Sequence, residues 1–141
     1  MRNSIPSFSQ ILKASVGRET QTRGWCHICR RYQQLATRKT ILSIPFVLMI
    51  NAAVNSGDAK QLWATPGWLP ERIGVIIDGG QFFCFEGEDL QLHLQRNMHN
   101  ITVYELVGMV ADINSGENQT SHLVSLINGM IIYCGMHQIR R

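Results

Sequence analysis

The residues with the clearest chemical potential in this chain are two cysteines separated by two residues. In Cys26-His27-Ile28-Cys29 the spacing lets a tight turn present both sulfurs to one zinc ion, an arrangement that needs four ligands to close. Only half of such a site is present in the sequence, because Cys84 and Cys134 stand alone in apolar stretches. We therefore expect Cys26 and Cys29 to lie at a hairpin tip. These two cysteines form either half of a zinc site or a metal-free turn that needs no cofactor. We favour the metal-free turn.

A cysteine protease is the second chemistry to consider, and it needs a thiolate beside a histidine whose imidazole is oriented by a third residue. His122 is a candidate general base. None of the thiols is a convincing nucleophile, because Cys26 and Cys29 form a turn pair. Cys84 has neither a helix N-terminus nor a cationic neighbour to lower its pKa. We predict no catalytic site, and we interpret His122 more simply as a surface or hydrogen-bonded structural residue.

Metal-dependent nuclease chemistry would need clustered carboxylates that hold two metal ions. The acidic residues instead fall mainly in expected turns and polar loops. The densest group, residues 86–89, reads Glu-Gly-Glu-Asp and is interpreted as a solvated loop. No nuclease site is predicted from these residues.

The composition indicates a folded domain with an uneven charge distribution. With 141 residues, 45% of them apolar, the chain suits a packed core, and we expect residues 1–141 to form one unit. Residues 1–41 hold eight Lys/Arg and one acid, whereas residues 42–139 hold three bases and nine acids. The basic end is a candidate surface for nucleic acid or acidic protein, although solvated charges around a hairpin would give the same count.

No segment is expected to cross a membrane. The longest late apolar run, residues 123–134, is shorter than the roughly 20 residues that a spanning helix requires. The first 17 residues also lack the apolar core of a secretion signal, which predicts an intracellular protein.

The elements that would position these residues are mostly strands. Ser7 and Gly17 bound a short amphipathic helix, and residues 24–29 form a turn followed by an extended stretch over 32–44. The apolar run 46–50 predicts a strand buried on both faces, and residues 55–71 predict an irregular connection.

Further strands are expected in the second half of the chain. Residues 72–77 and 81–85 flank Asp78-Gly79-Gly80 and predict a hairpin. Two more strands are expected within 101–113 and 122–128, with a polar loop at 114–118. The fold class is therefore α+β, mostly antiparallel β with a short N-terminal helix.

Two segments resemble boxes of the ubiquitin-specific protease family. The first runs from Trp25-Cys26-His27-Ile28-Cys29-Arg30-Arg31-Tyr32-Gln33-Gln34 through residues 36–40 to 44–50. The second runs from Tyr104-Glu105-Leu106-Val107-Gly108-Met109-Val110 to Ser121-His122-Leu123-Val124-Ser125, with His122 at the general-base position. The resemblance implies a partial papain-like fingers and palm fold.

Within that family the amino-acid sequence is most similar to the inactive domain of the catalytic subunits of poly(A) nuclease deadenylation complexes. The box that would supply the nucleophile has no counterpart here, and residues 52–54 read Ala-Ala-Val where active members have Lys-Arg-Phe. The resemblance therefore implies a non-catalytic scaffold whose parent protein shortens poly(A) tails through another domain.

The implied partners are the other domains and subunits of that complex, in the cytoplasm and in association with P-bodies. Direct RNA contact stays open. The alternatives are a degenerate or active deubiquitinase fragment and a stand-alone RNA-binding module.

Overall fold

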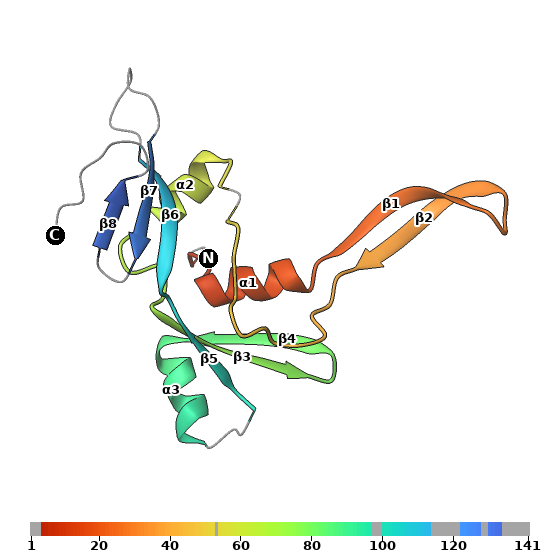
Figure 1. Ribbon diagram of the computed structural model, residues 1–141. Coiled ribbons are helices and arrows are strands. Elements are labelled where there is room, and N and C mark those ends of the chain that lie inside the picture. Colours follow the sequence, from red (N-terminus) through yellow and green to blue (C-terminus); the bar gives the residue numbers. More distant parts are fainter. Residues whose placement is uncertain (1–3, 53, 97–99, 114–121, 128–129, 134–141) are drawn as a thin grey trace. The chain divides into compact units, whose positions relative to one another are not determined.

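The computed structural model describes residues 4–52, 54–96, 100–113, 122–127 and 130–133. Its contacts fall into two compact units, Met1–Tyr104 and Glu105–Arg141, which are described separately below. The expectation that residues 1–141 form one domain stays a prediction. Helices and antiparallel strands are both present, which confirms the α+β class with a short N-terminal helix (Figure 1).

The first helix, α1 (Phe8–Val16), begins and ends where its capping residues predict. Ser7 accepts a hydrogen bond from the backbone N–H of Gln10, and the Gln10 side chain accepts one from the Ser7 N–H, so both ends of a capping box are present. Gly17 ends the helix by donating its N–H to the carbonyl of Lys13. The helix predicted from Ser7 to Gly17 is confirmed.

Strands β1 (Glu19–Cys26) and β2 (Arg31–Arg38) form a two-stranded antiparallel hairpin directly after α1. Their register pairs Glu19 with Arg38 at one end and Cys26 with Arg31 at the other. Figure 1 shows the pair as a long twisted ribbon. Nearly all of its side chains are exposed or half-buried, so cross-strand pairs rather than a core hold it together.

A three-stranded sheet with the order β4–β3–β5 forms the centre of the first unit. Strand β3 (Arg72–Asp78) pairs antiparallel with β4 (Gln81–Glu86), and β5 (Thr102–Glu105) lies on the other side of β3. The turn between β3 and β4 places Gly79 and Gly80 at φ 56° and 74°, a conformation that glycine adopts without strain. The predicted hairpin around this turn is confirmed.

The core of this unit joins the sheet to α1 and to the segment before β3. Its buried residues are Phe8, Trp68, Ile73 and Val75. Phe8 makes edge-to-face contact with Trp68 at a ring-centroid distance of 5.8 Å, and the indole Nε1 of Trp68 donates to the carbonyl of Pro6 across 2.8 Å. Packing, not exposed stacking, is therefore the role of Trp68.

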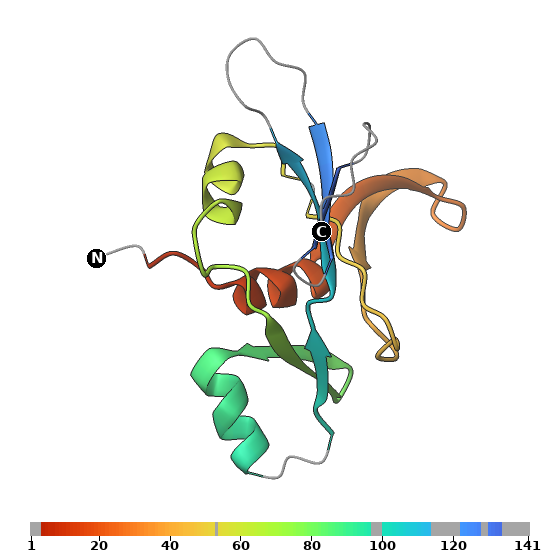
Figure 2. The ribbon, with the colours of Figure 1, turned by 60° about the vertical axis from the view of Figure 1, so that its left-hand side comes forward.

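Helix α3 (Gly87–Gln95) lies beside β3 and β4 (Figure 2) and begins where a solvated loop was expected. That interpretation of residues 86–89 is wrong. Glu88 and Asp89 occupy the first helical turn, where the positive end of the helix dipole favours carboxylates. Leu90 is buried against the sheet, which fixes the helix in place.

Two further expectations in the first unit are wrong. The connection over residues 55–71 contains a helix, α2 (Gly57–Trp63), whose N-cap Ser56 accepts from the Ala59 N–H. The expected buried strand over 46–50 is neither a strand nor buried, and Phe46 is fully exposed. An apolar run becomes a strand only when another strand takes its backbone hydrogen bonds, and none in the described chain does so here.

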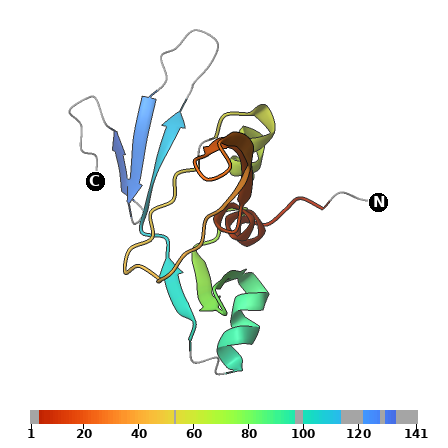
Figure 3. The ribbon, with the colours of Figure 1, turned by 90° about the vertical axis from the view of Figure 1, so that its right-hand side faces the viewer.

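The second unit is an antiparallel sheet with the order β6–β7–β8, visible side by side in Figure 3. Its strands are β6 (Gly108–Ile113), β7 (His122–Ile127) and β8 (Met130–Tyr133). The strand predicted from His122 is confirmed, whereas the one predicted over 101–113 divides into β5 and β6. The polar loop expected at 114–118 lies outside the described residues.

No helix among the described residues is both long enough and apolar enough to cross a membrane.

Candidate functional site

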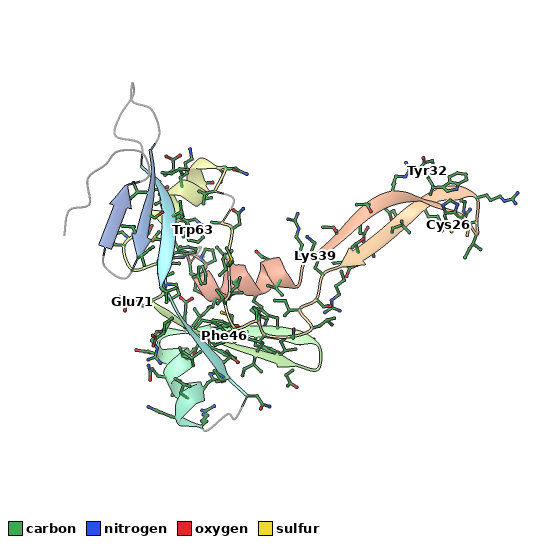
Figure 4. All side chains as sticks on the ribbon, in the orientation of Figure 1. Cys26, Tyr32, Lys39, Phe46, Trp63 and Glu71 are labelled. Atoms are coloured by element: carbon green, nitrogen blue, oxygen red, sulfur yellow. The ribbon has the colours of Figure 1, made fainter. Side chains whose placement is uncertain are left out.

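The turn between β1 and β2 positions the two cysteines that the sequence singled out. Cys26 is the last residue of β1 (Figure 4), and Cys29 lies in the turn that leads to β2. The turn closes through a hydrogen bond of 2.8 Å from the Arg30 N–H to the Cys26 carbonyl, with Arg30 in the left-handed region at φ 53°. The expectation that both cysteines lie at a hairpin tip is confirmed.

The backbone of this turn favours the thiolate of Cys26. The N–H of Cys29 donates to Sγ of Cys26 across 3.4 Å. This bond lowers the pKa of the Cys26 thiol, and hydrogen bonding from the Ile28 backbone adds to the effect. A thiolate is the form of cysteine that binds metals and attacks electrophiles.

The metal-binding capacity of this pair rests on two ligands. Two thiolates on one turn suit zinc, which is usually held by four ligands. Among the described residues, no cluster of three or more His, Cys, Asp or Glu is placed to hold a metal ion. Cys134, the other cysteine outside the pair besides Cys84, lies outside the described residues. Zinc binding by Cys26 and Cys29 stays a prediction.

Cys84 occupies a different environment, on β4 opposite Val75. It is half-buried, and burial raises the pKa of its thiol to about 11, with a smaller contribution from the negative charge of Glu86. At neutral pH this thiol stays protonated. Cys84 therefore lacks the activation that a protease nucleophile requires.

His122 begins β7, where its backbone is in register with Ile113 of β6. It belongs to the second unit, whereas Cys26, Cys29 and Cys84 belong to the first. The side chain of His122 lies outside the described part of the structure. Its role as a general base is therefore untested.

An aromatic pair next to the cysteine turn was not predicted. Trp25 and Tyr32 face each other across the hairpin with ring centroids 5.4 Å apart at 69°. Figure 4 shows Tyr32 close to Cys26 near the end of the hairpin. The sequence could have predicted this pair, because a four-residue turn after Cys26 places Trp25 and Tyr32 opposite each other on the two strands.

A second exposed feature is the 42–50 strip, a name used below for the exposed apolar side chains of Leu42, Phe46, Val47, Met49 and Ile50. Leu42 and Met49 are each 90% exposed. The segment is anchored from its other side, because Ile44 and Leu48 pack on the core and the Tyr104 hydroxyl donates to the Pro45 carbonyl. Large apolar side chains exposed together on one short segment are typical of contacts with other protein.

The sequence and the fold match a known class of protein. Residues 1–132 match the family model described as ubiquitin carboxyl-terminal hydrolase, so the chain belongs to that family.

Curated relatives carry a more specific description. A protein of Phaeosphaeria nodorum, "PAN2-PAN3 deadenylation complex catalytic subunit PAN2", is 66% identical over 123 residues, which are 87% of this chain and 11% of the relative. The protein of the same description from Chaetomium globosum is 65% identical over 86% of this chain and 11% of its own length. The chain thus spans about a tenth of the length of these relatives.

A solved structure agrees with this relationship. The Neurospora crassa Pan2 catalytic unit, described as protease and nuclease domain, is 48% identical and superposes with a TM-score of 0.76. The match covers 88% of this chain and 20% of that one. The resemblance to a ubiquitin-hydrolase-like domain of deadenylase catalytic subunits, inferred from the Cys26 and His122 segments, is confirmed.

Proposed function

We propose that this chain serves as a non-catalytic interaction domain in the catalytic subunit of a poly(A)-specific deadenylase. The observation that carries the proposal is the 66% identity to a PAN2-PAN3 deadenylation complex catalytic subunit over 87% of this chain. Poly(A) shortening would then belong to another domain of the parent protein. The solved relative, whose description names a nuclease domain, supports that division of roles.

The described thiols support the absence of hydrolase activity. Cys84 is held protonated by burial, and Cys26 and Cys29 occupy an exposed hairpin turn rather than a helix N-terminus. A cysteine hydrolase needs its thiolate, general base and orienting residue within hydrogen-bond reach. Burial disfavours the thiolate of Cys84, which supports the non-catalytic proposal.

The 42–50 strip supports an interaction role. Leaving Leu42, Phe46 and Met49 in water is unfavourable, because each buried apolar side chain is worth about 1.5–3 kcal/mol. Contact with further protein of the same complex would remove that cost. We propose the nuclease domain and the partner subunit named in the relatives' description as the proteins contacted, in the cytoplasm and in P-bodies.

A ubiquitin-based electrophilic probe tests the alternative of a deubiquitinase. The proposal predicts no covalent adduct after incubation of the chain with the probe, with an active ubiquitin-specific protease as the positive control. Mass spectrometry would locate any adduct. Capture that depends on the ubiquitin moiety at Cys26, Cys29 or Cys84 would overturn the non-catalytic proposal.

Co-purification tests the interaction role. A tagged form of this chain, co-expressed with the nuclease domain of the Neurospora crassa Pan2 catalytic unit, should retain that domain on an affinity column. Phe46→Asp should abolish retention, because it places a charge in the 42–50 strip. Ile28→Asp is the matched control, since Ile28 is 94% exposed and lies at the hairpin turn. Equal loss in both variants, or no retention by the unmodified chain, would contradict the proposal.

A further inference from the structure

One face of the β1–β2 hairpin combines exposed aromatic and basic side chains. Side chains alternate between the two faces of a strand, so Arg23 and Trp25 share a face with their cross-strand partners Gln34 and Tyr32. The same face continues to Arg38, which pairs with Glu19 at the base of the hairpin. From Trp25 to Glu19 it extends ~20 Å at the usual rise of a strand. We call this surface the hairpin face.

The outer end of the hairpin face is an open aromatic platform. Trp25 and Tyr32 support each other edge to face, which stabilises a cross-strand pair by about 0.5–1.5 kcal/mol. Even so, Trp25 remains 47% exposed and Tyr32 64% exposed. The pair therefore retains free ring surface on which a planar group can stack.

The inner end of the hairpin face opens into a basic pocket. Lys13 at the last turn of α1, Arg38 at the end of β2 and Lys39 line an open pocket of about 240 Å³. Its other wall includes Gly80 of the β3–β4 turn and Gln81 at the start of β4. Figure 4 marks Lys39 at this end of the hairpin, away from Cys26 and Tyr32.

The charged side chains that line this pocket are all basic. No Asp or Glu is among the described residues that line it. Lys13 has its Nζ 4.6 Å from the ring centroid of Phe83, which holds the ammonium group in place without neutralising it. Glu19, opposite Arg38, is the one acid in residues 1–41.

We propose that the hairpin face binds single-stranded nucleic acid, with a base stacked on Trp25 and Tyr32 and backbone phosphates in the pocket of Lys13, Arg38 and Lys39. Non-sequence-specific binding of single strands uses this combination of aromatic stacking and a basic groove. An acidic peptide would satisfy the cations but would leave the aromatic platform unused. The inference does not rest on the proposed scaffold role, because it needs neither the nuclease domain nor a partner subunit.

Fluorescence anisotropy with a labelled oligoadenylate of about 20 nucleotides tests the proposal on the full 141-residue chain. Binding should be measurable at about 50 mM salt and should weaken steeply toward about 200 mM, because each phosphate contact contributes about 0.7 to the logarithmic salt slope. Arg38→Gln combined with Lys39→Gln should weaken binding about tenfold and reduce the slope by about 1.4. Trp25→Leu should weaken binding about fivefold or more through lost stacking.

A matched control variant distinguishes binding at the hairpin face from a general effect of net charge. Lys60→Gln combined with Arg96→Gln also removes one Lys and one Arg, but from α2 and from the end of α3, and should change the affinity less than about twofold. Arg38, Lys39, Lys60 and Arg96 are all exposed, so circular dichroism should show the same fold in both double variants. The charge variants decide the question even if Trp25→Leu disturbs the hairpin.

Several results would overturn the proposal. The first is no binding by the folded chain at low salt, and the second is equal weakening in the two double variants. A third is competition by polyglutamate as effective as that by unlabelled oligoadenylate at equal charge, which would identify an acidic protein surface instead. Failure here would leave the nuclease-domain co-purification result unchanged, so the two proposals fail separately.

Discussion

The backbone N–H of Ser9 donates a hydrogen bond to Oε2 of Glu86 across 2.7 Å and thereby joins the first turn of α1 to the end of β4. The amides of a first helical turn have no acceptor within the helix, and a carboxylate at that end also meets the positive side of the helix dipole. Ser9 is buried and Glu86 half-buried, so little water replaces this contact. The bond is thus a tertiary clamp on the N-terminal helix.

Removing this carboxylate should destabilise the first unit. Glu86→Ala is expected to lower the free energy of unfolding by about 1–2 kcal/mol, because the Ser9 amide loses a charged acceptor. Urea denaturation followed by tryptophan fluorescence would measure the change, since Trp63 and Trp68 both contact Phe8 of α1. Glu88→Ala, at an exposed position of α3, should change it by less than about 0.5 kcal/mol. Equal effects would refute the clamp.

Gly74 on β3 allows the buried side chain of Leu90 to approach the sheet. A Cβ at this position would lie 2.4 Å from Cδ1 of Leu90 and 3.1 Å from Cγ2 of Ile101. Gly74→Ala should therefore lower the free energy of unfolding by about 1–3 kcal/mol through overpacking. Gly57→Ala is the matched control in α2, where an added Cβ meets nothing within 4 Å. Urea denaturation of both variants would test the difference, and an unchanged Gly74→Ala midpoint would contradict it.

The raised pKa of Cys84 should make the stability of the fold depend on pH in the alkaline range. Burial raises the pKa of this thiol to about 11, above its ordinary value of 9.0 in an unfolded chain. Its neutral form is thus favoured by folding, and this contribution is complete below pH 9 and lost as the pH rises toward 11. After allowance for partial exposure, the loss is about 1 kcal/mol. Urea denaturation at pH 9 and pH 11 should show a smaller decline in the free energy of unfolding for Cys84→Ala than for the unmodified chain. An identical decline in the two proteins would show that the Cys84 thiol is not its cause.

Elements with local capping or turn signals could be predicted from the sequence. Ser7 with Gln10 defines a capping box, and Asp78-Gly79-Gly80 defines a tight turn, so α1 and the β3–β4 hairpin depend on neighbouring residues. The hairpin tip that holds Cys26 and Cys29 was predicted for the same reason. Its register then follows from the length of the turn.

Elements that depend on distant partners could not be predicted in the same way. Residues 46–50 have the composition of a buried strand, but composition does not state whether another strand pairs with them. Here the segment is anchored by the packing of Ile44 and Leu48 and by the Tyr104 bond to the Pro45 carbonyl. Helix α2 is only seven residues long, and the glycine and proline around it are typical of an irregular connection. The capping residue Ser56 was therefore not recognised as the start of a helix. The basic pocket forms from three separated segments, so only the three-dimensional arrangement reveals it.

The last prediction concerns zinc at Cys26 and Cys29. The N–H bond from Cys29 favours a thiolate at Cys26, which suits a metal ligand, but tight binding also needs the ion enclosed by four ligands. Metal analysis of the purified chain should therefore find well under one zinc per molecule. Replacing both cysteines by Ser should shift the melting temperature by less than about 2 °C, because both residues lie at the hairpin turn away from the core. Stoichiometric zinc, or unfolding by a chelator, would show instead that a second pair of ligands completes the site.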